Sequence, residues 1–360
     1  MCTLSSLSEV KCTLWRDDVN LQRPVSGAAQ RHDVRARLYL RIEHDGVAGF
    51  GEIAPQPLAL NGDPSIDEVL EELSQVTMPQ VLDVATREGA LPSWTRVARF
   101  AGSRAASSFS VALVEMALLD RDVRVSGDAI SSLWPKNFDT PNQSTVSIID
   151  LDEWSFATDV ARVRVKTTPG PVAQRALEQL GELAVPVLLD FNCSASSDDQ
   201  VLEQVEQISR VATIDAVEQP YAPGNVIDHA TLAEQLSVPI SLDEGVRSAR
   251  DLEQIARYSA ASIVCLKPAR IGGLANTKDM AQRAVSLSLE PYIGGFFESP
   301  YARRVHRLLA NNCIAQPSDV VDVAVQRDRQ FDELERVAGG FEVEPSRELL
   351  AGARIIATWP

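Results

Sequence analysis

Paired cysteines, long apolar runs and an excess of positive charge are all missing from this chain of 360 residues. No apolar run approaches the roughly 20 residues of a membrane span, and the first residues lack the basic and apolar parts of a secretory leader. The cysteines form no Cys-x-x-Cys pair, which argues against a disulfide framework and a zinc site. They are Cys2, Cys12, Cys193, Cys265 and Cys313. We therefore expect a cytoplasmic protein.

The charge balance limits the partners of the protein. The chain has 50 acidic and 34 basic residues and a formal net charge of -16, which would repel a phosphate backbone or an anionic membrane surface. We expect no nucleic-acid partner and no membrane partner. The sequence is compatible with a homo-oligomer. At 45% hydrophobic residues, the chain can form one large domain and a smaller one.

The first 125 residues have the pattern of an α+β domain. The segment VRARLYLRIEHDGVAGFGEI alternates as a strand, turns at Asp45-Gly46 and continues as a second strand, which predicts an antiparallel hairpin. Further on, SSFSVALVEMALLDRDV places Phe109, Ala112, Leu113 and Met116 on one helical face.

From about Ser144 the pattern changes to short apolar runs separated by helical stretches. The runs are STVSII, ARVRVK, VPVLLDF, IDAVEQP, VPISLDE, ASIVCLK and EPYIGG. Strand and helix repeated in this order predict parallel strands with right-handed crossovers, and a weak eighth strand near NCIAQ would close a (β/α) barrel. We predict an α/β fold with an α+β capping domain at 1–125, a barrel at 126–320, and a last segment, 321–360, that returns to the cap.

A charged residue lies at the C-terminal end of five successive predicted strands. Lys166, Asp190, Glu218, Asp243 and Lys267 are 24, 28, 25 and 24 residues apart, close to one strand-helix unit each. We therefore expect them in a ring at one mouth of the barrel, where such enzymes have their active sites. The alternative, unrelated helix caps and surface charges, requires type, order and spacing to coincide by chance.

The middle three residues of this ring are carboxylates on neighbouring strands, and the two lysines lie on opposite sides of the mouth. Three hard oxygen ligands with room for substrate suit Mg²⁺, and the absence of a nearby histidine or cysteine argues against zinc. The sequence therefore predicts a magnesium site at Asp190, Glu218 and Asp243.

The segments RVK, LDFN, VEQP, LDEG and LKPARIGG resemble those of the enolase superfamily, in the muconate-lactonizing-enzyme subgroup with a lysine on each side. The resemblance extends to GFGEIAP, EMALLD and GGFFES. It implies an enolase-like, modified TIM barrel with Mg²⁺ as cofactor.

The same resemblance implies the roles of individual residues. Lys166 and Lys267 would be the catalytic residues on opposite faces of a small carboxylate substrate. Arg164, Asn192 and Glu244 would support the metal-binding carboxylates. Burial beside Mg²⁺ and other cations is expected to lower the pKa of a site lysine enough for base catalysis.

Two segments depart from the family pattern. Arg164 stands where a first lysine is usual and keeps a positive charge that cannot act as a base. FESPYAR replaces a glycine-rich pattern after the seventh strand. In PSDVVDV, Asp319 and Asp322 have the wrong spacing for the Asp-x-Asp of dipeptide epimerases, and we interpret them as solvated loop acids.

Substrate contacts are predicted in two loops. RPVSGAAQRHD, in the position of the cap's specificity loop, offers Ser26, Gly27 and Arg31, although an ordinary surface loop is an equal alternative. The segment after the seventh strand adds the candidates Gly294, Gly295 and Glu298.

The predicted function is a Mg²⁺-dependent lyase of the o-succinylbenzoate synthase type in menaquinone biosynthesis. GEIAPQP, which is similar to a turn of those enzymes, and the missing Asp-x-Asp favour this activity. Muconate cycloisomerase, N-acylamino acid racemase and dipeptide epimerase share the same catalytic residues and remain alternatives. A non-catalytic binding scaffold is the competing class.

Overall fold

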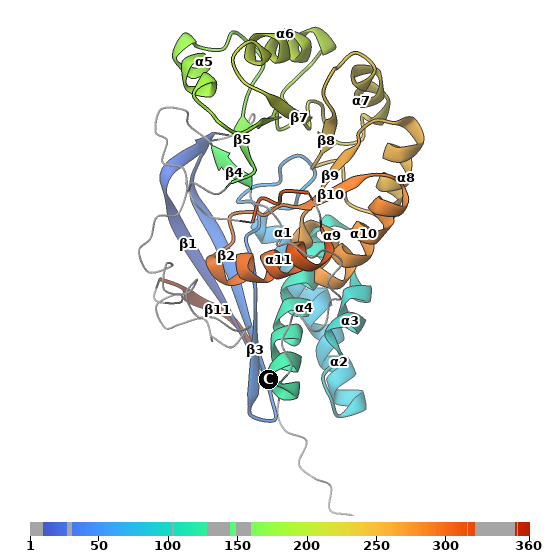
Figure 1. The fold of residues 1–360 in the computed structure, drawn as a ribbon. Helices are drawn as coiled ribbons and strands as arrows, with labels where there is room; N and C mark the ends of the chain where they lie inside the picture. The colour runs from blue at the N-terminus through green and yellow to red at the C-terminus, as the bar shows by residue number, and fades with distance from the viewer. Residues whose placement is uncertain are drawn as a thin grey trace, which may run out of the picture.

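The computed structural model describes residues 10–26, 31–102, 104–127, 145–148, 160–314, 316–320, 350 and 352–360. Two sheets organise these residues, one antiparallel and one parallel (Figure 1). Among the described helices, none combines the length and apolar character needed to cross a membrane.

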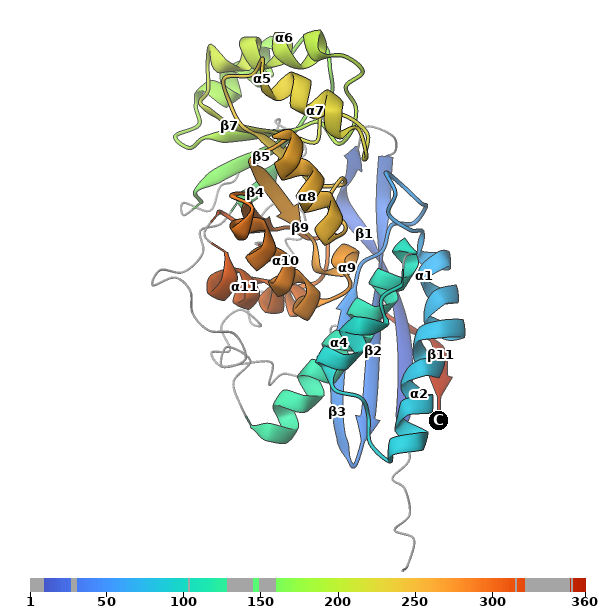
Figure 2. The ribbon, with the colours of Figure 1, turned by 90° about the vertical axis from the view of Figure 1, so that its right-hand side faces the viewer.

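The N-terminal part is an antiparallel sheet of order β11-β1-β2-β3 with helices on one face (Figure 2). Its strands are β1 (Lys11–Ser26), β2 (Arg31–His44), β3 (Val47–Ile53) and β11 (Arg354–Trp359). Its helices are α1 (Ile66–Glu72), the π-helical turn η1 (Leu73–Thr77), α2 (Met78–Glu88), α3 (Trp94–Val97), the 3-10 turn η2 (Ala98–Phe100) and α4 (Ala105–Ser126). The predicted hairpin at Asp45-Gly46 joins β2 to β3 and is confirmed. Strand β11 pairs with β1, so the end of the chain lies in the first sheet.

Helix α4 packs directly on strand β3 because the strand has glycines where the two meet. A Cβ atom on Gly51 would lie 2.2 Å from the backbone oxygen of Leu113, a distance that no side chain tolerates. Phe109, Leu113 and Met116 of α4 are buried, as the helical pattern predicts. The helix also contacts the other half of the molecule, where the ring of Phe109 lies 5.2 Å from that of Phe296.

The second sheet is parallel and contains seven described strands in the order β10-β9-β8-β7-β6-β5-β4. They are β4 (Thr145–Ile148), β5 (Arg162–Lys166), β6 (Val187–Asp190), β7 (Ile214–Glu218), β8 (Ile240–Leu242), β9 (Ile263–Leu266) and β10 (Glu290–Ile293). The helices are α5 (Gln174–Gly181), α6 (Asp198–Ser209), α7 (Val226–Ala233), α8 (Ala249–Tyr258), α9 (Pro268–Ile271), α10 (Leu274–Ser286) and α11 (Pro300–Cys313).

This alternation confirms the predicted fold, a (β/α) barrel of the enolase type with an α+β cap. The eighth strand predicted at NCIAQ is wrong for Asn312 and Cys313, which form the end of helix α11. The polar residues that precede Ile314 continue the amphipathic pattern of that helix, which outweighs the short apolar run. The predicted boundaries at 125 and 320 remain a prediction.

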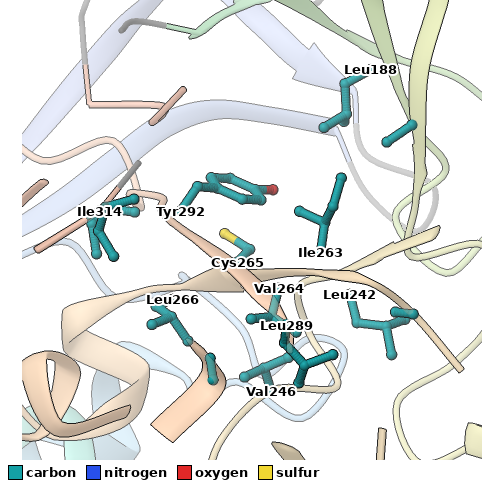
Figure 3. Packing of buried hydrophobic residues seen from close by; sticks show 14 of the residues in the cluster. Leu188, Leu242, Val246, Ile263, Val264, Cys265, Leu266, Leu289, Tyr292 and Ile314 are labelled. Atoms are coloured by element: carbon teal, nitrogen blue, oxygen red, sulfur yellow. The ribbon is translucent and has the colours of Figure 1, made fainter. Parts of the chain in front are cut away.

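Side chains of the parallel strands alternate between the inside of the curled sheet and its outer, helix-covered face. Figure 3 shows Ile263, Cys265 and Tyr292 on one side of strand β9, with Val264 and Leu266 on the other. All five are buried. Apolar packing on both faces holds the strands rigidly, so that the residues at their ends have fixed positions.

Candidate active site

Five charged side chains meet at one edge of the parallel sheet. Lys166, Asp190 and Glu218 are the last residues of β5, β6 and β7, and they are paired in register. Asp243 and Lys267 directly follow β8 and β9. The structure therefore brings together the five residues that the strand spacing singled out.

The three carboxylates are fully buried and converge on one point. The Nη2 atom of Arg164 lies 2.6 Å from Oδ2 of Asp190 and 3.6 Å from Oδ2 of Asp243, and it also donates to Oε1 of Glu218. Because a single nitrogen contacts all three side chains, their oxygens face a common centre.

Burial and neighbouring charges set the protonation of these carboxylates. Burial raises the pKa of Glu218 to about 8, and the charges of Asp190 and Asp243 add to this effect although Arg164 opposes it. Burial also acts to raise the pKa of Asp243, but Lys267, Arg270 and Arg164 together outweigh it and hold that pKa well below its usual range. The neighbouring cations therefore stabilise the charged form of Asp243 more than that of Glu218.

The two lysines differ in their surroundings. Lys166 donates to Oδ1 of Asn192 and lies 3.2 Å from Oδ2 of Asp190, with its side chain partly exposed. Lys267 is buried, with Nζ 2.7 Å from Oδ2 of Asp243 and 4.6 Å from the centre of the Phe296 ring. Burial is the largest single influence and would lower the pKa of Lys267, but the neighbouring Asp243 and Cys265 together raise that pKa above its usual value. The expected lowering of a lysine pKa refers to the site with Mg²⁺ bound, and it stays a prediction.

Asn192 and Glu244 contact the cluster from the side of Asp190. The backbone N–H of Asn192 donates to Oδ1 of Asp190 at 3.0 Å, and its side-chain amide donates to Oε1 of Glu244 at 3.3 Å. Glu244 is buried, and its Oε2 atom has no hydrogen-bond partner within the part of the chain that the structure describes. Asn192 therefore orients Asp190, whereas Glu244 reaches that carboxylate only through Asn192.

Arg270 and Asp63 also belong to the cluster and were missed in the sequence. Nη1 of Arg270 donates to Oδ1 of Asp243 at 2.6 Å, and its Nε and Nη2 atoms each lie 2.8 Å from a carboxylate oxygen of Asp63. All three side chains are buried. In the sequence, Arg270 is visible as a charged residue among the apolar residues of LKPARIGG. Its partner Asp63, however, is 207 residues away.

One phenol and one further acid lie next to the cluster formed by Arg164 and the carboxylates. The hydroxyl of Tyr292 donates to Oε2 of Glu218, the second oxygen of that carboxylate. Oδ2 of Asp319 lies 3.1 Å from Nη1 of Arg164, and Asp319 is 9% exposed. The interpretation of Asp319 as a solvated loop acid is therefore wrong, because a buried arginine pairs with it. Asp322 lies outside the described residues.

Comparison with known proteins identifies the family. The family model described as "Enolase C-terminal domain-like" matches residues 156–346. The chain belongs to the enolase superfamily. This confirms the resemblance seen in the strand-end motifs, and the protein is an enzyme of the muconate-lactonizing-enzyme subgroup.

Relatives within the superfamily carry several names. The chain is 24% identical over 317 residues to an o-succinylbenzoate synthase of Bacillus subtilis, covering 84% of this chain and 81% of the relative. It is 27% identical over 307 residues to a chloromuconate cycloisomerase of Cupriavidus pinatubonensis, covering 81% and 80%. The crystal structure of an N-succinyl Arg/Lys racemase from Bacillus cereus superposes with a TM-score of 0.75 at 15% identity, covering 96% and 99%. That structural likeness shows the shared fold.

Members of the enolase superfamily generally use Mg²⁺. Among the described residues, no group of three or more histidine, cysteine, aspartate or glutamate side chains is set to hold a metal ion as the side chains stand. The donor set nevertheless fits Mg²⁺ chemically, because three buried carboxylates face one point at which a cationic nitrogen already lies. A hard divalent cation could replace that nitrogen.

The loop after β10, which departs from the family's glycine-rich pattern, connects the barrel to the cap. Ser299 caps helix α11 by accepting from the backbone N–H of Tyr301, and its own backbone N–H donates to Glu52 at 2.5 Å. The hydroxyl of Tyr301 donates to the backbone oxygen of Phe50 at 2.7 Å. Ser299 and Tyr301, on either side of Pro300, therefore bind the start of helix α11 to strand β3.

The predicted substrate contacts in this loop have structural partners in the protein. A Cβ atom on Gly294 would lie 3.2 Å from Cε of Lys267, so the glycine allows this lysine to pass close to the backbone. Glu298 is buried and accepts from the backbone N–H of Phe296 at 2.7 Å, and a Cβ atom on Gly295 would meet its carboxylate. Contact of these residues with substrate stays a prediction.

The predicted contacts in the cap loop lie at the edge of the described structure. Ser26 and Arg31 are paired at the facing ends of β1 and β2, and Gly27 lies outside the described residues. Their contact with substrate also stays a prediction.

Proposed function

We propose that this enzyme is a lyase that removes the proton α to a carboxylate and expels a hydroxyl group, as in the o-succinylbenzoate synthase step of menaquinone biosynthesis. The observation that supports it best is the pair of lysines on either side of the buried carboxylate cluster. Lys166 ends β5 and contacts Asp190, whereas Lys267 follows β9 and contacts Asp243. A small carboxylate bound between them would present opposite faces to the two ammonium groups.

In this proposal Asp190, Glu218 and Asp243 hold Mg²⁺. When bound, the ion supplies positive charge for the second negative charge that develops on the substrate carboxylate as the proton leaves. Asn192 keeps Asp190 in place through its backbone N–H, and Arg270 does the same for Asp243.

Lys166 is the proposed base, and Lys267 is the proposed fixed charge. Lys166 is the more exposed of the two, which allows its Nζ atom to exchange a proton with solvent between turnovers. The pKa of Lys267, which the neighbouring Asp243 and Cys265 together raise despite burial, suits a group that stays protonated. A protonated lysine near the enediolate would stabilise it by charge and by hydrogen bonding.

The names of the relatives include other reactions of the same subgroup, which remain alternatives for this enzyme. Muconate cycloisomerisation and racemisation of N-acylamino acids, including dipeptide epimerisation, would use the same lysines and metal ligands. The proposal includes a cytoplasmic location, favoured by the free cysteines Cys12, Cys193 and Cys265. It also includes a small carboxylate as the only substrate class. No nucleic acid and no membrane is proposed as a partner, and the protein can be a monomer or a homo-oligomer.

Product analysis distinguishes the reactions. The purified protein with Mg²⁺ is incubated separately with a hydroxylated cyclohexadiene carboxylate and with both enantiomers of an N-succinylamino acid in deuterated water. We expect dehydration of the first substrate at a kcat/KM well above that for deuterium exchange into the second. Exchange into both enantiomers without dehydration would overturn the lyase proposal and favour a racemase. A sample treated with EDTA is the control for metal dependence.

A further inference from the structure

Arg164 occupies the point that a metal ion would need. Its Nη2 atom contacts Asp190 at 2.6 Å and Asp243 at 3.6 Å, and it also donates to Glu218. A nitrogen at this separation from the oxygens leaves no room for a second atom among them. The guanidinium is buried, and an arginine side chain keeps its positive charge at neutral pH.

Two cations at one point exclude each other by charge as well as by volume. A divalent ion a few ångströms from a buried guanidinium would be repelled by several kcal/mol even at an effective dielectric constant of about 20. The carboxylates that attract the metal ion are the same ones that hold Arg164. Binding of one cation therefore requires the other to leave.

The structure also provides a second anchor for the displaced group. Nη1 of Arg164 lies 3.1 Å from Oδ2 of Asp319, whereas the three carboxylates contact the other terminal nitrogen, Nη2. A guanidinium has two such nitrogens, so Arg164 can give up Nη2 contacts and keep a charged partner at Nη1. A lysine, with one nitrogen, cannot bridge both places.

We propose that Arg164 is a built-in competitor of the divalent metal ion, and that metal binding moves its guanidinium from the carboxylate cluster toward Asp319. This inference rests on the metal site of the proposed function. It assigns Arg164 a positioning role that the usual lysine would not have, because the arginine lowers the metal affinity and keeps the metal-free cluster neutralised.

The test is metal affinity, measured without turnover. Mg²⁺ binding is followed by calorimetry, and Mn²⁺ binding by electron paramagnetic resonance, in wild type, Arg164→Lys and Arg164→Met. We expect both variants to bind more tightly than wild type by at least about tenfold, the value of one charged hydrogen bond no longer broken. We also expect metal-free Arg164→Met to melt earlier than wild type and to gain more in Tm when Mg²⁺ is added.

A matched control is available on the same strand. Arg162 is buried two residues before Arg164, but it pairs with Asp215 and not with the carboxylate cluster. Arg162→Lys is the same chemical change and should leave the metal dissociation constant unchanged. If it tightens metal binding as much as Arg164→Lys does, a general loosening of the barrel explains both results and the competition is refuted.

Asp319→Asn tests the second anchor and does not depend on the stability of the Arg164 variants. It should weaken metal binding in wild type, where the displaced guanidinium needs a partner, but should have no effect when combined with Arg164→Met. Equal metal affinity of wild type and both Arg164 variants would overturn the competition and leave the metal site standing. Absence of binding in all of them would instead remove the metal site, and with it the proposed function.

Discussion

The carboxylate of Glu115 accepts a hydrogen bond from the backbone N–H of Leu274, with 2.6 Å between Oε2 and the nitrogen. Its other oxygen accepts from the N–H of Ala275 at 2.8 Å. Glu115 lies in helix α4 of the cap, and the two N–H groups open helix α10 of the barrel. A side chain from one half of the molecule thus caps a helix of the other half, satisfying donors that lack partners within their own helix.

This buried cap predicts a pH-dependent stability. Burial raises the pKa of Glu115 to about 8, although its two backbone hydrogen bonds oppose the shift. Between the pKa of the unfolded chain, about 4.5, and about 8, the native state therefore holds a proton that the unfolded chain has released. We expect the contribution of Glu115 to the free energy of unfolding to fall with rising pH in this window, by up to about 1.4 kcal/mol per pH unit.

Urea unfolding between pH 5 and pH 9 measures the effect. Glu115→Gln should remove this part of the pH dependence, because its amide does not titrate. The difference in free energy of unfolding between wild type and variant should therefore decline from pH 5 to pH 8 and then level off. Parallel curves for the two proteins would show that the carboxyl group does not titrate in that range.

Gly273 is needed where Glu115 approaches. Its φ is +107°, and a Cβ atom would lie 2.3 Å from Oε2 of Glu115. We expect Gly273→Ala to lower the free energy of unfolding by about 2–4 kcal/mol, from both the overlap and the left-handed backbone. Gly224, with φ of +92° and open space around it, is the matched control, and Gly224→Ala should cost only about 1 kcal/mol. Similar losses in urea denaturation for the two variants would refute the packing argument.

The ends of the strands could be predicted from sequence because each depends on local information. An apolar run of strand length that ends in a charged residue, repeated at a nearly constant spacing, determines which side chains share one edge of a parallel sheet. Lys166, Asp190 and Glu218 are paired in register, as this reasoning requires.

Contacts between distant segments could not be predicted in the same way. The pairing of Asp63 with Arg270 and of Asp319 with Arg164 joins segments that the sequence separates by 207 and 155 residues. The spacing of the strands predicts which residues lie at one edge of the parallel sheet. It does not predict which neighbours a long side chain such as that of Arg164 contacts there. Arg164 was therefore expected to support the carboxylates, whereas its guanidinium lies between them.

Asp243→Asn is expected to abolish activity while the fold is retained. Asp243 contacts Lys267 at 2.7 Å and Arg270 at 2.6 Å, so an amide there removes a proposed metal ligand and leaves two buried cations undercompensated. We expect kcat/KM to fall at least about 100-fold and stability to fall by about 3 kcal/mol. Asp215→Asn, which affects an ion pair with Arg162 outside the cluster, is the control. Near-normal activity of Asp243→Asn at limiting Mg²⁺ would remove Asp243 from the site.

The lysine pair separates elimination from racemisation. In a syn elimination one base can remove the proton and return it to the leaving hydroxyl, so only Lys166 needs to exchange a proton and Lys267 needs only its charge. A racemisation needs an exchanging base on each face. Arginine keeps the charge but cannot act as a base at neutral pH, which makes Lys→Arg the decisive substitution at both positions.

For a lyase, Lys267→Arg should keep dehydration within about tenfold of wild type, whereas Lys166→Arg should lose at least about 100-fold in kcat. Lys267 is the more crowded of the two, with Phe296 at 4.6 Å from Nζ, so the Mg²⁺ affinity of each variant is measured to separate altered geometry from altered chemistry. Solvent deuterium exchange on N-succinylamino acids provides the companion result. If wild type exchanges both enantiomers and each arginine variant loses exchange of one, both lysines act as bases, and the assignment of Lys267 as a fixed charge is refuted.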